Sequence, residues 1–220
     1  MSEIVLMSDP KVAAIPVEDC GERLVDVRCG GSLLVDERRQ DPAGAFAYLR
    51  EGVLERLLKA QAMLPHGLRL LFVEGYRPPS LQREYFEEYA GRLQTGNPTW
   101  SDAQIHAAAS RYVSPPDIAP HSAGAAVDLT LADLGGRELD LGTRMNAEPE
   151  ESEGACYTHT ANISEEARAN RKSLGAVLAA AGLVNYPTEW WHWSFGDRYW
   201  ALISGEATAL YGPKEITPRG

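Results

Sequence analysis

Apolar runs and helically spaced apolar positions alternate along the first half of the chain. The short apolar runs 24–27 and 33–35 predict two strands, and the longer run 68–73 predicts a third, buried strand. Between them, apolar residues recur at helical spacing from 46 to 58. Asp41 and Pro42 precede this segment as a favourable helix start. The pattern therefore predicts a helix that begins near residue 42 and ends before Pro65.

The second half of the chain continues the mixture of helices and strands. Ser80 is expected to cap a helix that extends to about residue 93. Ser101 and Gln104 have capping-box spacing, which predicts a helix to about residue 113. Residues 124–131 are strand-like, 132–163 lack a regular pattern, and Ser164 begins a further helix. A turn at Pro187 then leads into a tryptophan-rich strand. Helices come first and strands cluster later, so we predict an α+β fold, in a single domain over 1–220.

The composition restricts the partners more than it restricts the chemistry. Apolar residues make up 44% and charged residues 24% of the chain, as in a soluble folded protein. The formal net charge of -10 argues against a nucleic-acid or anionic-membrane partner. Cys20, Cys29 and Cys156 form no CxxC pair, so we predict free thiols. With no signal peptide and no membrane-spanning run, we expect a cytoplasmic protein; the sequence does not predict an oligomeric state.

The tryptophan-rich stretch from Glu189 to Trp193 also contains a carboxylate and an imidazole. A Glu three residues before a His is typical of metallohydrolases, in which one residue binds zinc and the other moves a proton. The alternative is a buried aromatic strand with a hydrogen-bonded His. In a regular strand, Glu189 and His192 would face opposite sides. Pro187 indicates that Glu189 belongs to the preceding turn, from which it can reach a site that includes His192.

His121 and Asp128 supply two further candidate ligands. A catalytic zinc usually takes three protein ligands and one water. Asp128 lies between apolar residues, where an unpaired carboxylate is costly, so it needs a cation: zinc, or alternatively an Arg. We predict one zinc per chain, bound by His121, Asp128 and His192, with Glu189 as general base and acid.

Arg77, held between Tyr76 and Pro78, is the candidate for stabilising an oxyanion. The alternative is a structural salt bridge to Asp128 or Glu74. Among the other histidines, His159 in an irregular segment is the rival for a metal or substrate role.

Three stretches together resemble a known family: Glu-Gly-Tyr-Arg-Pro at 74–78, His-Ser-Ala-Gly-Ala-Ala-Val-Asp-Leu-Thr at 121–130, and Glu-Trp-Trp-His at 189–192. They are similar to the VanX-type D-alanyl-D-alanine dipeptidases. This family belongs to the zinc D-Ala-D-Ala peptidase group, which also holds DD-carboxypeptidases and resembles the hedgehog fold. The resemblance covers about residues 45–203.

The resemblance implies a central, mostly antiparallel sheet that carries the zinc and is packed by helices. It implies the same roles for the three ligands, Glu189 and Arg77, and a small peptide as substrate. Two positions depart from the family. Ala119 stands where the family has Ser, and Asn146 stands where it has an Asp that holds the substrate ammonium. Glu148 or Glu150 could replace that Asp.

Three functions follow from these residues. The first is zinc-dependent hydrolysis of D-Ala-D-Ala or a related D-amino-acid dipeptide. The second is a DD-carboxypeptidase that acts on longer peptidoglycan stems, and the segment 132–163 would decide between the two by closing or opening the cavity. The third is a non-catalytic, zinc-stabilised binding module, against which Glu189 and Arg77 argue.

Overall fold

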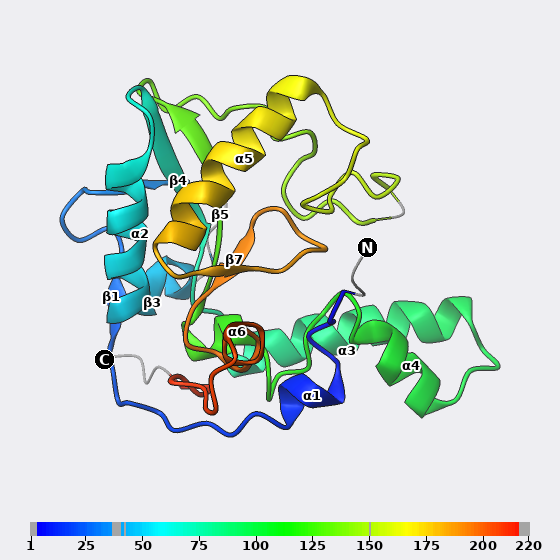
Figure 1. Cartoon of the computed structure of the whole chain (residues 1–220). Helices are drawn as coiled ribbons and strands as arrows, with labels where there is room; N and C mark the ends of the chain where they lie inside the picture. Colours follow the sequence, from blue (N-terminus) through cyan, green and yellow to red (C-terminus); the bar gives the residue numbers. More distant parts are fainter. Residues whose placement is uncertain (1–3, 37–40, 42, 150, 216–220) are drawn as a thin grey trace.

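A five-stranded sheet forms the centre of the protein, in a computed structural model that describes residues 4–36, 41, 43–149 and 151–215 (Figure 1). The strand order is β2–β4–β5–β7–β6, and every neighbouring pair is antiparallel except β2 and β4. The bounds are β2 Leu34–Val35, β4 Leu68–Glu74, β5 Ala126–Asp133, β6 Val184–Asn185 and β7 His192–Ser194. This confirms the predicted α+β class and the mostly antiparallel sheet.

Helices and a small second sheet surround the central sheet. The second sheet pairs β1 (Leu24–Asp26) with β3 (Tyr48–Arg50). The α-helices are α1 Pro10–Ala13, α2 Glu51–Met63, α3 Pro79–Gly96, α4 Asp102–Ala109, α5 Glu165–Ala180 and α6 Arg198–Ser204. Two short 3₁₀ helices are η1 (Ala45–Ala47) and η2 (Pro120–Ala123). In Figure 1, α2 and α5 lie side by side over the sheet, whereas α3 and α4 extend away from it.

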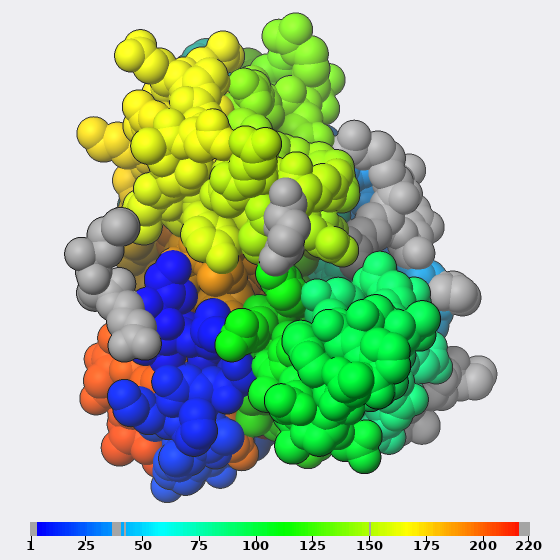
Figure 2. Space-filling view, turned by 90° about the vertical axis from the view of Figure 1, so that its right-hand side faces the viewer, coloured from blue at the N-terminus to red at the C-terminus, as the bar shows by residue number. Residues whose placement is uncertain are grey.

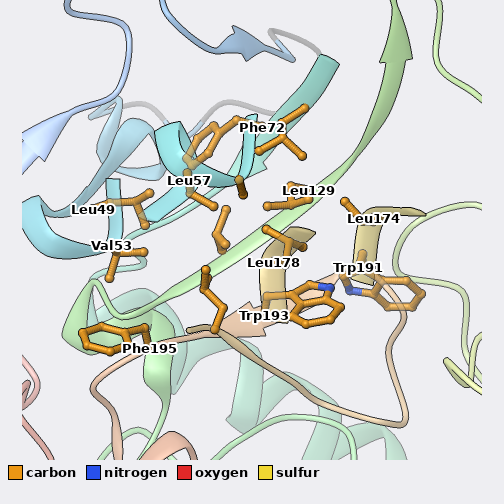
Figure 3. Close-up of a cluster of buried hydrophobic side chains, with 14 of the residues drawn as sticks. Leu49, Val53, Leu57, Phe72, Leu129, Leu174, Leu178, Trp191, Trp193 and Phe195 are labelled. Carbon is orange, nitrogen blue, oxygen red and sulfur yellow. The ribbon is translucent and has the colours of Figure 1, made fainter. Parts of the chain in front are cut away.

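The two faces of the sheet have different roles, and the alternation of side chains along β5 separates them. Val127, Leu129 and Leu131 all belong to the main hydrophobic core. They pack with residues of α2 and α5, as Figure 3 shows for Leu129 beside Leu57 and Leu178. Because successive strand residues face opposite sides, the intervening residues of β5, Asp128 among them, face away from this core. The core therefore fixes the strand that presents the polar face.

The first predicted helix starts later than its sequence pattern indicated. Residues 45–47 form η1 and 48–50 form β3, so α2 begins at Glu51. The antiparallel pairing of β3 with β1 overrides the helical spacing of this segment, a tertiary contact that a local pattern does not contain. Asp41 is not the cap of this helix, since the N-cap positions are Gly44 for η1 and Arg50 for α2; its Oδ2 accepts a hydrogen bond from the Phe46 amide at 2.8 Å. Pro42 lies outside the described residues.

The other helix starts are partly as predicted. The Ser101 capping box is present, although α4 ends at Ala109 rather than near residue 113. Ser164 caps α5 by accepting a hydrogen bond from the Ala167 amide. Ser80 caps nothing: α3 begins at Pro79, and Ser80 lies within its first turn. The strands also do not cluster late, since β1, β2 and β3 all precede α2.

Two further sequence predictions concern the membrane and the thiols. Within the part of the chain that the structure describes, no helix has both the length and the apolar character needed to cross a bilayer. All three cysteines are free, with Cys156 buried and the other two exposed, so the prediction of free thiols is confirmed.

The segment predicted to be irregular, 132–163, loses its first two residues to β5, and its described residues from 134 onwards contain no helix or strand. One buried side chain makes several of its contacts. Arg171 on α5 donates hydrogen bonds to the carbonyls of Leu141, Ala155 and Tyr157, at 2.7 to 2.8 Å. Burial lowers the pKa of Arg171 to about 10, which leaves it charged at neutral pH. Arg171 thereby joins residues 141 and 155–157 of the irregular segment to α5.

Arg50 links the N-terminal and C-terminal segments to the turn before β5. Its buried guanidinium donates to the carbonyls of Ala123 at 2.8 Å, Glu22 at 2.6 Å and Gly212 at 3.1 Å. It also pairs with Asp19 at 2.7 Å. Four segments that are distant in sequence therefore meet at one cation.

We predict that Arg50→Met destabilises the protein by about 3 kcal/mol or more, because it leaves buried carbonyl groups without a donor. Urea unfolding at 25 °C should give a clearly lower midpoint. Arg23→Met is the matched control, since Arg23 pairs with Glu51 on the surface with a side chain 74% exposed. An Arg50→Met midpoint equal to that of this control would contradict the assigned role of Arg50.

Candidate metal centre

Three of the predicted site residues converge on the polar face of the sheet. Asp128 on β5 and His192 on β7 are direct cross-strand partners. Directly opposed residues on antiparallel strands project their side chains from the same face, about 5 Å apart. His121 comes from η2, the turn that leads into β5. Sheet register therefore places two of the three donors, and the adjoining turn places the third.

The three donor atoms form a nearly equilateral triangle. His192 Nδ1 lies 3.0 Å from Asp128 Oδ1 and 3.2 Å from His121 Nε2, and the third side measures 3.4 Å. Zinc–ligand bonds of about 2.0–2.1 Å in a tetrahedron require donor atoms about 3.3 Å apart. Two imidazole nitrogens and one carboxylate oxygen are also donors that zinc prefers. Both the spacing and the donor set fit a zinc ion.

Hydrogen bonding orients His121 for this role. Its Nδ1 donates to the Gly75 carbonyl at 2.6 Å, which leaves the Nε2 lone pair facing the other two donors. Gly75 itself can have no side chain, because a Cβ there would lie 2.4 Å from the Tyr48 carbonyl oxygen. Gly124, at φ +66°, packs in the same way against Leu24 and Arg50. Gly124 thus allows the turn before β5 to pack closely against β1 and β3.

Burial makes the negative charge of Asp128 in this cluster energetically costly. His121, Asp128 and His192 are 5%, 3% and 4% exposed. Burial acts to raise the pKa of Asp128, but the two imidazoles together lower this pKa well below its usual value. Asp128 is therefore a carboxylate whose charge needs a buried cation. Arg77 is the alternative partner that the sequence left open, but its guanidinium pairs with Glu74 instead.

Glu189 lies in the turn before β7, as the sequence predicted. Its Oε2 is 4.0 Å from His192 Nδ1, and its side chain is 27% exposed. Burial raises the pKa of Glu189 to about 7, partly offset by His192. The Trp191 indole lies close enough to lower that pKa slightly, although it makes no hydrogen bond within 3.5 Å. A carboxyl group with a pKa near neutrality can both accept and release a proton.

Arg77 is held rigidly at the edge of the cluster. Its Nε donates to Glu74 at 2.6 Å, and its Nη1 donates to Gln82 at 2.8 Å. Gln82 is in turn anchored to the Ser114 carbonyl. The predicted salt-bridge alternative is thus present, with Glu74 as the partner. The pairing also fixes the guanidinium plane, so that Arg77 keeps its position on the wall of the metal cavity.

Two adjoining cavities contain these side chains. The metal cavity, of about 260 Å³, is lined by Arg77, the three clustered ligands and Glu189. A second cavity, of about 440 Å³, lies on the other side of Glu189. Asn146 and Glu189 line both, so the two cavities adjoin there. Ala119 lies on the wall of the metal cavity.

The remaining histidines lie away from the cluster. His159 is exposed and lines a separate cavity of about 790 Å³ beside α5. His106 stacks on Phe86 with ring centroids 5.0 Å apart, and His66 is exposed in the turn after α2. The structure therefore gives His159 no place in the metal cavity.

Sequence reasoning missed several residues that shape the site. Gln82 is 2% exposed and holds Arg77, and Tyr186 packs edge-on to His192 with centroids 6.1 Å apart. A buried Gln in the first turn of a helix was the available signal for Gln82. Arg111 and Tyr112, which line both cavities, follow α4 in a segment without any pattern that points to a site.

Comparison with known proteins points to one family. A family model described as D-ala-D-ala dipeptidase, Peptidase M15, matches residues 37–204. A D-alanyl-D-alanine dipeptidase of Synechocystis sp. is 32% identical over 219 residues, covering 86% of this chain and 87% of that protein. One of Enterococcus faecium is 32% identical over 150 residues, covering 66% and 71%. Among solved structures, the LdcB LD-carboxypeptidase aligns over 98% of this chain and 94% of that chain, with 15% identity and a TM-score of 0.47.

We predict that the purified protein binds about one zinc ion per chain and that Asp128→Asn weakens zinc binding by at least ~100-fold, because the charged donor is lost. Competition with a chelator, followed by metal analysis after dialysis, measures both. His159→Ala is the control and should bind zinc as the wild type does. Unchanged affinity in Asp128→Asn would contradict the ligand assignment.

Proposed function

The chain belongs to the D-Ala-D-Ala dipeptidase family, and we propose that it hydrolyses the peptide bond of D-Ala-D-Ala or a related D-amino-acid dipeptide with one bound zinc ion. The observation that carries this proposal is the triangle of His121, Asp128 and His192 donors beside Glu189 and Arg77 in one cavity. His121, Asp128 and His192 would hold the zinc. Zinc in that position would supply a Lewis acid that polarises the scissile carbonyl and lowers the pKa of water.

Glu189 is the proton carrier of the proposed reaction. Its raised pKa, about 7, lets it accept a proton from the attacking water at neutral pH and then donate that proton to the leaving amine. Its position in a turn, rather than in β7, directs the carboxylate over the cluster although His192 is only three residues away. Trp190 and Trp191 are buried beside it and limit the access of bulk water.

Arg77 is proposed to stabilise the negative charge that develops on the carbonyl oxygen. Its Nε and Nη1 are held by Glu74 and Gln82, and the rest of the guanidinium faces the metal cavity wall. A donor that is fixed before the reaction needs no reorganisation when the charge forms. The ion pair with Glu74 thus serves orientation as well as charge balance.

Substrate recognition differs from the family pattern at Asn146. This residue adopts a left-handed conformation, with φ 58°, and lines both cavities. As a neutral side chain it can accept a hydrogen bond from a substrate ammonium but cannot neutralise its charge. Glu148, two residues further along, lines the second cavity and is the described carboxylate that can do so. Glu150 lies outside the described residues.

The second cavity beside the metal cavity favours a second candidate function, a carboxypeptidase that acts on longer stems ending in D-Ala-D-Ala. Segment 134–163 forms a wall of this second cavity through residues 146–149 and Tyr157. Equal rates on D-Ala-D-Ala and on an N-acylated peptide with the same end would favour this function. A rate that collapses on N-acylation would favour the dipeptidase.

We predict that Glu189→Gln lowers kcat on D-Ala-D-Ala by at least ~100-fold while zinc content stays the same, because the amide cannot carry the proton. Steady-state kinetics with metal analysis of the same samples tests this. Glu87→Gln, an exposed carboxylate on α3, is the control. A zinc-loaded wild type that is stabilised by zinc but hydrolyses no D,D-dipeptide or stem peptide would support the binding module instead.

For Arg77→Lys we predict a decrease in kcat of about 100-fold or more with a KM within a few-fold of the wild type, because lysine lacks the fork of donors. Arg83→Lys is the control, because Arg83 is exposed on α3. A variant that loses thermal stability but retains kcat would show that Arg77 is only a structural partner of Glu74.

A further inference from the structure

The second cavity has features of a binding site in its own right. Four segments that are distant in sequence line it: Leu6 near the N-terminus, the α3–α4 region, residues 146–149 with Tyr157, and the turn that carries Glu189. In Figure 2, the yellow-green segment lies above, and the blue N-terminal segment and the green helices lie below. Orange chain is visible in the hollow between them. The cavity thus has an open side, through which a longer substrate can extend from the metal site.

Cations lie on one wall of this cavity. Arg92 on α3 and Arg111 after α4 both line it and are exposed. Neither guanidinium forms an ion pair with a carboxylate of the described residues, and Arg92 lies over the Tyr89 ring at 5.1 Å. Glu148, within residues 146–149, is an acidic residue that also lines this cavity. In a chain with a net charge of -10, two arginines without such partners beside the site form a local positive region.

Two buried polar atoms on the same cavity also lack partners. The Thr188 hydroxyl and the Trp191 indole nitrogen are fully buried and make no hydrogen bond of ordinary geometry within the described structure, with Tyr186 and Glu189 as their respective polar neighbours. Both side chains line the cavity, and Trp191 is only 2% exposed. Buried donors without a partner are uncommon in native proteins and need an acceptor. The two atoms and the two guanidinium groups are all hydrogen-bond donors.

We propose that the second cavity is a subsite for the substrate residue on the amino side of the D,D-pair, and that it favours a residue with a carboxylate. The inference rests on the second candidate function above, hydrolysis of a stem that extends on the amino side. A dipeptide and a longer stem have the same free carboxyl end, so any extension lies on the amino side. Arg92 and Arg111 bind the carboxylate, and the Thr188 and Trp191 donors face the acceptor groups of the added residue.

The test compares N-acetyl-Glu-D-Ala-D-Ala with N-acetyl-Gln-D-Ala-D-Ala, which differ by one charge at almost equal size, with D-Ala-D-Ala as the reference substrate. We expect the zinc-loaded wild type to give a kcat/KM about three- to tenfold higher for the Glu peptide, since two exposed ion pairs contribute modestly. The ratio should decrease with added salt. A ratio near one in the wild type would overturn the proposal.

The variants Arg92→Gln and Arg111→Gln should each reduce this ratio towards one. Arg83→Gln should not, because Arg83 is exposed on α3 and lines neither cavity. A ratio that stays at the wild-type value in both cavity variants would also overturn the proposal.

Binding without turnover separates this subsite from the proposed function. Calorimetry with the zinc-loaded Glu189→Gln protein should give a Kd about three- to tenfold lower for the Glu peptide than for the Gln peptide. If the wild type hydrolyses none of the three substrates, the proposed function fails, and the calorimetric comparison still decides on the subsite. Equal Kd values there would overturn it.

Discussion

The pairing of Asp128 with His192 across β5 and β7 is the contact on which the candidate site depends. Cross-strand register alone brings a carboxylate and an imidazole to 3.0 Å, and His121 completes the triangle from the turn that begins β5. A shift of register by one residue would turn Asp128 into the hydrophobic core. The core residues Val127 and Leu129 therefore protect the site, because they make that shift very costly.

The same alternation explains how a buried carboxylate is tolerated. Asp128 is 3% exposed and has the two histidines as neighbours, while Arg77 is occupied by Glu74. Desolvating such a group is costly unless a cation is shared with it. Zinc bound by the three donors would supply that cation. A single bound zinc ion would therefore serve two purposes. It would take part in catalysis, and it would balance the buried charge of Asp128.

The sequence predicted the site better than it predicted the elements around it. His121, Asp128, His192, Glu189 and Arg77 were predicted to share one site because each lies in a short motif with a chemical reason for its spacing, and the structure brings these side chains together. The start of α2 at Glu51 was missed, because pairing of β3 with β1 overrides local helical spacing. Arg92 and Arg111 were missed for a related reason: only the tertiary arrangement of α3, α4 and the Glu189 turn places them on one cavity.

The sheet and the loops carry different parts of the candidate site, and this difference determines which parts of the site can change. The three candidate ligands lie on strands and a short turn, fixed by the core and by Arg50, which donates to the Ala123 carbonyl just after His121. The walls that meet the rest of a substrate lie on irregular segment 134–163, which Arg171 binds through backbone carbonyls alone. Backbone acceptors are the same for any side chain. Asn146 lies on this segment, so a change of side chain there leaves the loop anchor and the triangle of His121, Asp128 and His192 donors in place.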